Sequence, residues 1–116
     1  MRIKGEAKLL RIFIGETDKI GSVTVYEKIV LEARESGLAG ATVYRGIMGF
    51  GRSSRIHTTK VLRMSEDMPL VIEIVDEEKK ISDFVEVVES IFEEADAGGL
   101  ITMEKAEIIK YSAKEN

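Results

Sequence analysis

The sequence predicts a small α+β domain in which a four-stranded antiparallel sheet carries two helices on one face. Four short stretches of the sequence have the apolar character of strands, and apolar residues recur at helical spacing in two longer ones. The order along the chain is strand, helix, strand, strand, helix, strand. With right-handed crossovers this order packs most simply as the ferredoxin-like fold βαββαβ, with a long loop between the second and third strands. The chain of 116 residues fits a single domain, residues 1–116.

The first half of the chain predicts a strand, a helix and a second strand. Residues 6–15 alternate as a strand does, with apolar side chains on both faces. After a connection, Thr24 and Glu27 have the spacing of a capping box, in which both side chains satisfy free amides at a helix start. The helical pattern then continues to Gly37, which predicts a glycine stop. Strand character returns over residues 41–50.

The second half predicts a central strand, a long helix and a last strand. Residues 70–75 form a short apolar run, and Asp76 is a candidate cap for the helix that follows it. Gly98 and Gly99 are expected to end this helix, and residues 101–111 to form the last strand. One face of the helix is apolar at helical spacing: Ile81, Phe84, Val85, Val88, Ile91, Phe92 and Ala95.

The sheet face away from the helices is expected to be apolar as well. If the period of two holds, Arg11 and Glu73 lie on this face among hydrophobic neighbours. Such a patch is too large to leave exposed on a small monomer, so a closed cyclic assembly is expected to bury it. The apolar residues of this face are Leu9, Phe13, Val71 and Val75.

Composition limits the classes of function. The chain has no cysteine, which excludes disulfides, thiolate catalysis and cysteine-ligated metal sites. It has no apolar run long enough to span a bilayer, and it begins without a signal-peptide pattern, so we expect a cytoplasmic protein. An acidic pI of about 5.1 disfavours nucleic-acid binding, and the third strand lacks the aromatic residues on which RNA-recognition modules stack bases.

The segment from Arg45 to Arg63 has the opposite charge to the rest of the chain. It contains three glycines, the only histidine and five of the seventeen basic residues, but no Asp or Glu. It therefore carries +5 on a chain of net charge −4, and the remaining residues sum to −9. Such a segment attracts phosphates or carboxylates that the body repels, which predicts an anion-binding loop.

A phosphate-binding P-loop is excluded within this segment, although residues 46–53 nearly match its pattern. Arg52 stands where the motif needs lysine, and the β-branched residues that follow favour extended chain where a helix must begin. Gly49 and Gly51 can still let backbone amides approach an anion while Arg52 and Ser53 add charge and a hydroxyl. The alternative, equally open, is that these glycines only let a strand bulge and turn.

His57 is the only side chain of the sequence that titrates near neutral pH in its unperturbed form. The segment contains no acid to orient it as a base, and no nucleophilic serine motif accompanies it. A polar contact to a ligand and a role as acid or base both remain open. A single histidine does not build a transition-metal site within one chain, so no metal is expected.

The chain resembles the PII-like family of small proteins, long catalogued as a domain of unknown function and related to the PII nitrogen-signalling proteins. The resemblance covers nearly the whole chain. It rests on residues 38–51 (LAGATVYRGIMGFG), 53–57 (SSRIH), 70–76 (LVIEIVD) and 98–104 (GGLITME).

The resemblance implies a ferredoxin-like homotrimer that binds adenine nucleotides or other small effectors in the clefts between subunits. It places residues 45–63 where PII proteins carry their effector loop, with Gly49, Gly51, Arg52 and Ser53 at its ligand-facing base. The candidate ligand-binding residues are Arg45, Gly49, Gly51, Arg52, Ser53, Ser54, Arg55, His57, Lys79 and Lys80.

The preferred hypothesis is a non-catalytic regulatory protein. It would bind an anionic effector, such as an adenine nucleotide, and signal through residues 45–63 to a transporter or an enzyme. The alternative is a small trimeric enzyme that uses His57 as acid or base. Binding needs only complementary charge and shape, whereas catalysis needs an oriented base, so regulation is favoured.

Overall fold

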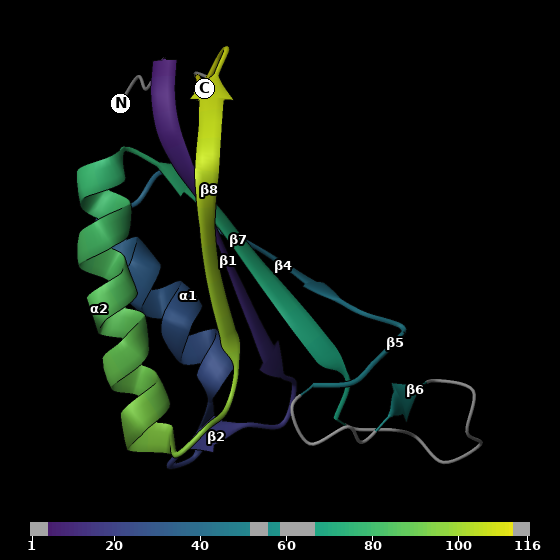
Figure 1. Ribbon diagram of the computed structural model, residues 1–116. Coiled ribbons are helices and arrows are strands. Elements are labelled where there is room, and N and C mark those ends of the chain that lie inside the picture. Colours follow the sequence, from purple (N-terminus) through teal and green to yellow (C-terminus); the bar gives the residue numbers. More distant parts are fainter. Residues whose placement is uncertain (1–4, 52–55, 59–66, 113–116) are drawn as a thin grey trace.

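The computed structural model describes residues 5–51, 56–58 and 67–112, and these form the predicted α+β fold (Figure 1). Four antiparallel strands make one sheet in the order β4-β7-β1-β8. The strands of this sheet are β1 (Gly5–Gly15), β4 (Thr42–Arg45), β7 (Pro69–Asp76) and β8 (Leu100–Ile108), and the helices are α1 (Val25–Glu35) and α2 (Glu78–Ala95). Two short hairpins complete the described elements: β2 (Lys19–Ile20) with β3 (Val23–Thr24), and β5 (Met48–Gly49) with β6 (His57–Thr58).

Both helices cover the same face of the sheet, as Figure 1 shows. The core lies between them and alternate residues of the two central strands, because side chains of a strand point to opposite faces in turn. The helix-facing residues of β1 and β7 are thus buried, and the apolar stripes of α1 and α2 pack on them. The largest buried members are Leu10, Ile12, Ile29, Ile72, Ile74, Ile81 and Phe84. The predicted ferredoxin-like arrangement is confirmed.

Helix α1 begins and ends close to its predicted limits, but its first turn differs in bonding. Thr24 is the N-cap residue, yet it makes no cap bond to a backbone amide, and its hydroxyl donates to the Glu27 carboxylate at 2.7 Å. The predicted capping box is therefore wrong. The predicted glycine stop is confirmed, because Gly37 has a φ of +76° and the Leu38 amide donates to the Ala33 carbonyl at 3.1 Å.

Asp76 does not cap helix α2 in the predicted way. Glu77 is the N-cap residue, and Asp76 is fully buried as the last residue of β7. Its two carboxylate oxygens accept bonds from the Glu77 amide at 2.7 Å and from the Ala39 amide at 2.8 Å. Asp76 thus joins the segment after α1 to the junction of β7 and α2.

The end of helix α2 also differs from the expectation. Asp96, and not Gly98, takes the left-handed conformation, with φ of 51°. Gly99 is needed for a different reason, since a Cβ there would lie 2.7 Å from the Phe13 carbonyl oxygen and equally close to the Phe92 ring. The short side chain of aspartate tolerates the left-handed region, which is why the helix ends before the glycine pair.

Several strand limits differ from the predicted ones. The predicted strand over residues 41–50 is two strands, β4 and β5, separated by Gly46 and Ile47. The last strand ends at Ile108. The connection over residues 16–23 contains β2 and the start of β3, which turn at Gly21 with a φ of +62°.

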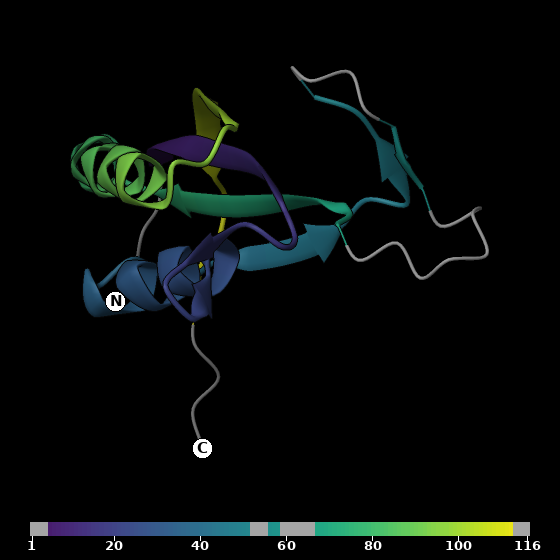
Figure 2. The same cartoon turned by 90° about the horizontal axis from the view of Figure 1, so that it is seen from below.

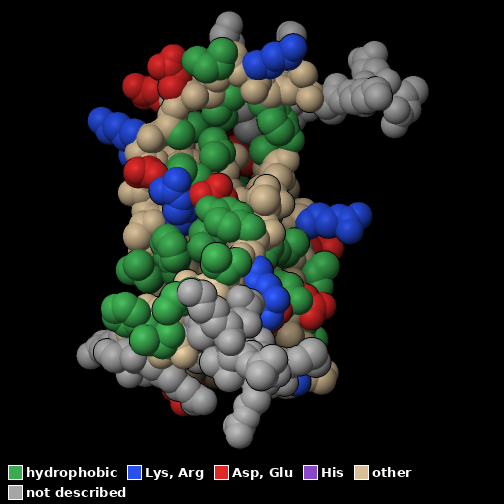
Figure 3. Space-filling view, turned by 90° about the vertical axis from the view of Figure 1, so that its right-hand side faces the viewer, with side chains coloured by type: hydrophobic (Ala, Val, Ile, Leu, Met, Phe, Trp, Pro, Cys, Tyr) green, Lys and Arg blue, Asp and Glu red, His purple; other side chains and the backbone are tan. Residues whose placement is uncertain are grey.

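The open face of the sheet has the composition predicted from the period of two. Arg11 lies directly opposite Glu73 across the β1–β7 pair, and Phe13 lies opposite Val71. These side chains are half-buried in the single chain. Figure 3 looks onto this side of the molecule, where apolar side chains gather around charged ones.

Candidate functional site

The basic segment leaves the sheet at the end of β4 by passing close over Pro69. The Gly46 amide donates to the Pro69 carbonyl at 2.7 Å, and a Cβ on Gly46 would lie 2.9 Å from the Pro69 ring. A Cβ on Gly49 would lie 3.2 Å from the same ring, whereas one on Gly51 would meet nothing within 4 Å. The chain therefore approaches Pro69 this closely because Gly46 and Gly49 lack side chains.

Beyond this crossing the segment forms a hairpin that stands away from the body (Figures 1 and 2). β5 and β6 pair antiparallel, with Met48 opposite Thr58 and Gly49 opposite His57. The backbone of His57 thus lies beside the first glycine of the predicted ligand-facing base. The other predicted contacts of this loop lie outside the described residues: Arg52, Ser53, Ser54 and Arg55.

Arg45, at the start of the segment, is bound to an acidic side chain of the body. Its Nε donates to Glu16 at 3.1 Å, and both side chains are partly exposed. The Arg45 charge is therefore already balanced in part within the single chain. An anion bound beside it would compete with the Glu16 carboxylate.

Two further carboxylates lie near this point, and sequence reasoning missed them. Asp18 accepts a bond from the Gly15 amide at 3.2 Å, and Asp67 accepts one from the Thr17 amide at 3.2 Å. Burial raises the pKa of the Asp18 carboxyl, and the charge of Asp67 acts in the same direction. The pairing of β1 with β7 brings these two carboxylates together, because it places Gly15 opposite Pro69. The segment after Gly15, which carries Asp18, then lies beside the segment before Pro69, which carries Asp67.

Lys79 and Lys80 lie far from the hairpin within one chain. They are in the first turn of α2, at the opposite end of β7 from Pro69, which is about 23 Å away at roughly 3.3 Å per strand residue. The Lys79 ammonium lies 3.1 Å from both oxygens of Asp83, and the Lys80 ammonium lies 3.5 Å from the Gly37 carbonyl. These lysines and the hairpin therefore do not form one site in a single subunit.

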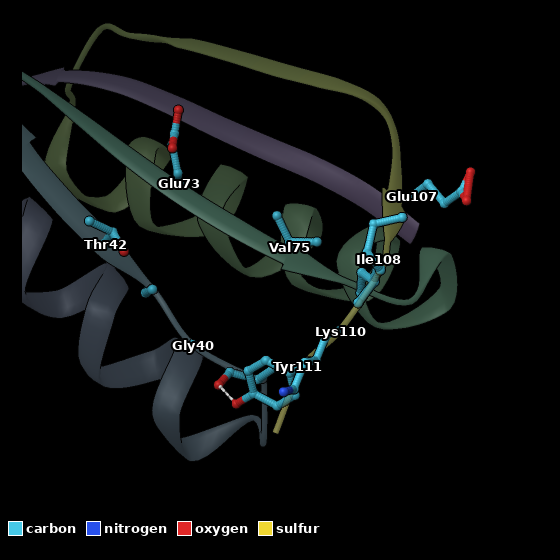
Figure 4. A pocket seen from close by; sticks show the side chains of 11 residues that line it. Gly40, Thr42, Glu73, Val75, Glu107, Ile108, Lys110 and Tyr111 are labelled. Carbon is cyan, nitrogen blue, oxygen red and sulfur yellow. Dashed lines mark hydrogen bonds between the residues drawn. The ribbon is translucent and has the colours of Figure 1, made fainter. Parts of the chain in front are cut away.

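An open groove of about 640 Å³ lies at that same far end, on the open face of the sheet (Figure 4). It runs between the start of β4, the last residues of β7 and the segment after β8. Tyr111 crosses to the other wall, where its hydroxyl donates to the Ala39 carbonyl. The groove exists because β4 pairs with β7 only as far as Thr42 opposite Glu73, which leaves Val75 without a neighbour on that edge. The sequence did not indicate this groove, because the predicted last strand continued to residue 111, whereas β8 ends at Ile108.

Two classes of feature are absent from the part of the chain that the structure describes. No three acidic or histidine side chains there come together as metal ligands would. Neither helix within residues 5–51, 56–58 and 67–112 combines the length and the apolar character that a membrane span requires.

Comparison of the sequence with known proteins finds a family and several relatives. The family model of DUF190, described as "Uncharacterized ACR, COG1993", matches residues 7–108. A UPF0166 protein of Aquifex aeolicus (strain VF5) is 39% identical over 102 residues, which cover 88% of this chain and 92% of the relative. A UPF0166 protein of Methanocaldococcus jannaschii is 32% identical over 105 residues, which cover 90% of this chain and 94% of the relative.

Solved structures share the fold at low sequence identity. CPII, a nitrogen regulatory PII-like protein from Thiomonas intermedia K12 solved with ADP, AMP and bicarbonate, matches with a TM-score of 0.68. It is 16% identical, and the match covers 89% of this chain and 88% of CPII. A putative PII-like signalling protein from Thermus thermophilus matches with a TM-score of 0.66 and 13% identity, over 90% of this chain and 91% of that one. The fold is thus that of the PII-like group.

Proposed function

Since this chain belongs to the DUF190 family and has the PII-like fold, we propose that it is a non-catalytic regulatory protein that binds an anionic effector. The effector class is an adenine nucleotide or a small anion, bound at clefts between subunits. Binding is signalled through residues 45–63 to a protein partner, either a transporter or an enzyme, in the cytoplasm. The observation that carries this proposal is the acid-free segment of charge +5 on a body of −9.

The geometry at the base of the segment supports an anion site beyond the crossing over Pro69. The body side of this crossing carries the carboxylates of Glu16, Asp18 and Asp67, which repel an anion. The basic residues that follow Gly51 in the sequence have no acidic neighbour along the chain as far as Arg63. An anion is therefore attracted to the hairpin side and not to the sheet.

The open sheet face supports a homotrimer. Four half-buried apolar side chains surround the pair of Arg11 and Glu73, and the outer edge of β8 has no strand partner within the described residues. A ring of copies would cover this face and pair the edge. In such a ring, Lys79 or Lys80 of one subunit would approach an anion held by the hairpin of a neighbouring subunit. Within one chain these lysines lie too far from the hairpin to do so.

The chemistry of the bound ligands in CPII makes nucleotides the first candidates. That protein was solved with ADP, AMP and bicarbonate, which are all anions. At 16% identity, the comparison with CPII concerns the fold alone. The proposal of an anionic effector for this chain therefore rests on the positive charge of its own residues 45–63.

Calorimetric titration with ATP, ADP, AMP and bicarbonate tests this function. Arg52→Ala or Arg55→Ala should remove roughly 1.5 to 3 kcal/mol of binding, a ten- to hundredfold weakening, because each would lose a charge-assisted hydrogen bond. His57→Ala should cost much less. Arg34→Ala, in the last turn of α1, is the matched control and should bind as the wild type does.

The same mixtures, incubated and analysed for products, test the catalytic alternative. A general base acts on the barrier more than on substrate binding, so the enzyme hypothesis expects turnover that His57→Ala abolishes while binding persists. That result, with both arginines dispensable for binding, would defeat the regulatory function proposed here.

A further inference from the structure

The groove at the far end of the open sheet face is large enough for a small ligand (Figure 4). Its volume of about 640 Å³ lies within the range of about 300 to 1,000 Å³ that is usual for small-molecule sites. It lies at the opposite end of β7 from Pro69, so it is separate from the basic segment within one chain. Three features of its lining indicate the chemistry of a ligand: a strand edge without a partner and two side chains of opposite charge.

The strand edge belongs to Val75. The Gly46 amide donates to the Pro69 carbonyl, so Pro69 directs its carbonyl toward β4. Peptide groups of a strand face its two neighbours in turn, and Val75 lies an even number of residues further along, so its N–H and C=O also point toward β4. β4 begins at Thr42, opposite Glu73, and within the described residues neither group of Val75 has a hydrogen bond on that side. A donor and an acceptor are thus available together at the groove, where backbone groups normally find a partner.

The two side chains of opposite charge are Glu73 and Lys110. Arg11 and Tyr44 both bind Oε2 of Glu73, which leaves its Oε1 without a hydrogen bond in the described part of the chain. Arg11 also binds Glu104, so one guanidinium is shared by two carboxylates and a net negative charge remains on this part of the face. Lys110 is exposed and makes no ion pair with another described residue.

These polar groups follow one another along the groove. In Figure 4, Val75 lies between Glu73 on one side and Lys110 on the other. Glu73 and Val75 are two residues apart on β7, which is about 7 Å along the strand. A ligand that satisfies all three features therefore has a positive end, a middle that donates and accepts a hydrogen bond, and a negative end. The rest of the lining is mainly small or apolar: Ala39, Gly40, Ala41, Ile108, Ile109 and the ring of Tyr111.

We propose that this groove binds a short zwitterionic peptide of two or three apolar residues in an extended conformation. Its ammonium group binds Glu73, one of its residues exchanges main-chain hydrogen bonds with Val75, and its carboxylate binds Lys110. Extended peptides are recognised at unpaired strand edges in this way, with side-chain contacts adding specificity. The inference goes beyond the proposed function, since this site needs neither the anionic effector nor residues 45–63.

Calorimetric titration with trivaline tests the two charges. Its capped form, N-acetyl-trivaline amide, has the same side chains without charged ends and should bind about tenfold more weakly or worse, because two charge-assisted contacts are lost. Glu73→Gln and Lys110→Ala should each weaken trivaline binding about tenfold. The matched controls do not line the groove and should bind as the wild type does: Glu104→Gln, which also removes a carboxylate partner of Arg11, and Lys105→Ala, at an exposed position of β8.

Amide hydrogen exchange tests the pairing with Val75. Trivaline should slow exchange of the Val75 amide about tenfold or more and leave the Val71 amide, which already faces Tyr44 in the sheet, unchanged. Gly40→Val should abolish both the binding and this protection, because it adds a side chain to the wall of the groove where a Cβ meets no atom within 4 Å. Its thermal unfolding and its nucleotide titration should match those of the wild type.

Any of four results would overturn the proposal. They are the absence of trivaline binding, equal affinity for trivaline and its capped form, a loss of binding in the control variants as large as in their matched partners, and a Val75 amide that is already protected in the free protein. The last result would mean that a neighbouring copy or a chain end occupies the edge. Calorimetry with nucleotides reports separately on the proposed function: a wild type that binds trivaline but no nucleotide or bicarbonate keeps this site and lacks only the effector site.

Discussion

Arg11 and Glu73 face each other across the two central strands on the open side of the sheet, with Nε of Arg11 2.8 Å from the Glu73 carboxylate. The Tyr44 hydroxyl donates to the same carboxylate at 2.7 Å, and Arg11 also binds Glu104. A cluster of four polar side chains therefore connects all four strands on the open face of the sheet. In the single chain it is part-exposed, where such pairs contribute little to stability.

Stability at acid pH should depend on Glu73. The Arg11 guanidinium, and after it the Tyr44 hydroxyl, hold the pKa of the Glu73 carboxyl below its ordinary value of 4.5. A lowered pKa in the folded state gives stability that is present above the unfolded value and is lost as the pH falls through the folded one. Urea unfolding from neutral pH downward should therefore show a shallower acid loss in Glu73→Gln than in wild type. Matching slopes would contradict this.

Tyr44 offers a spectroscopic check of the same group. The hydrogen bond to Glu73 raises the pKa of the Tyr44 phenol above its ordinary value of 10.0. In Glu73→Gln that pKa should fall toward 10.0. Absorbance titration of the phenolates measures it, with Tyr44→Phe identifying which transition belongs to this residue. An unchanged Tyr44 transition would mean that the bond is not formed in solution.

Phe13→Glu should prevent assembly through the open sheet face. A carboxylate at this position would be buried and unpaired between copies, at a cost of several kcal/mol. Native mass spectrometry should then report monomer or aggregate, while Leu31→Glu on the exposed side of α1 keeps the wild-type mass. A Phe13→Glu protein that remains a trimer with unchanged Tm would refute the interface.

Removal of the buried Asp76 carboxylate should destabilise the fold. Asp76→Ala leaves the amides of Ala39 and Glu77 without their acceptor, and hydrogen bonds to charged groups contribute roughly 1.5 to 3 kcal/mol. Asp76→Asn keeps one acceptor oxygen and should cost less. Urea midpoints measure this, with exposed Asp83→Ala as the control. Equal midpoints for Asp76→Ala and the control would contradict the argument.

The glycines of the basic segment should differ in their tolerance of alanine. Gly46→Ala places a methyl 2.9 Å from the Pro69 ring, so the crossing must shift, at about 1 to 3 kcal/mol. Gly51→Ala meets nothing within 4 Å and should change stability by no more than about 0.5 kcal/mol. Thermal unfolding of both variants distinguishes them, and a loss of similar size at both positions would argue against close packing at Gly46.

Sequence pattern alone determined the fold and the orientation of its side chains. The period of two placed Leu10 and Ile12 in the core and Arg11 on the open face, and helical spacing placed Phe84 on the buried side of α2. These predictions succeeded because strand and helix periodicity are local properties. The charge of residues 45–63 was likewise a property of the sequence, and with it the proposal of an anion site.

Tertiary structure decided which distant residues meet. The Asp76 carboxylate binds the Ala39 amide 37 residues away instead of capping α2, and Asp18 and Asp67 converge because β1 and β7 pair in one register. The lysines at the start of α2 are separated from the basic hairpin by the length of β7. The physical reason is that periodicity specifies which face a residue occupies, whereas long-range contacts depend on strand register and on where each strand ends.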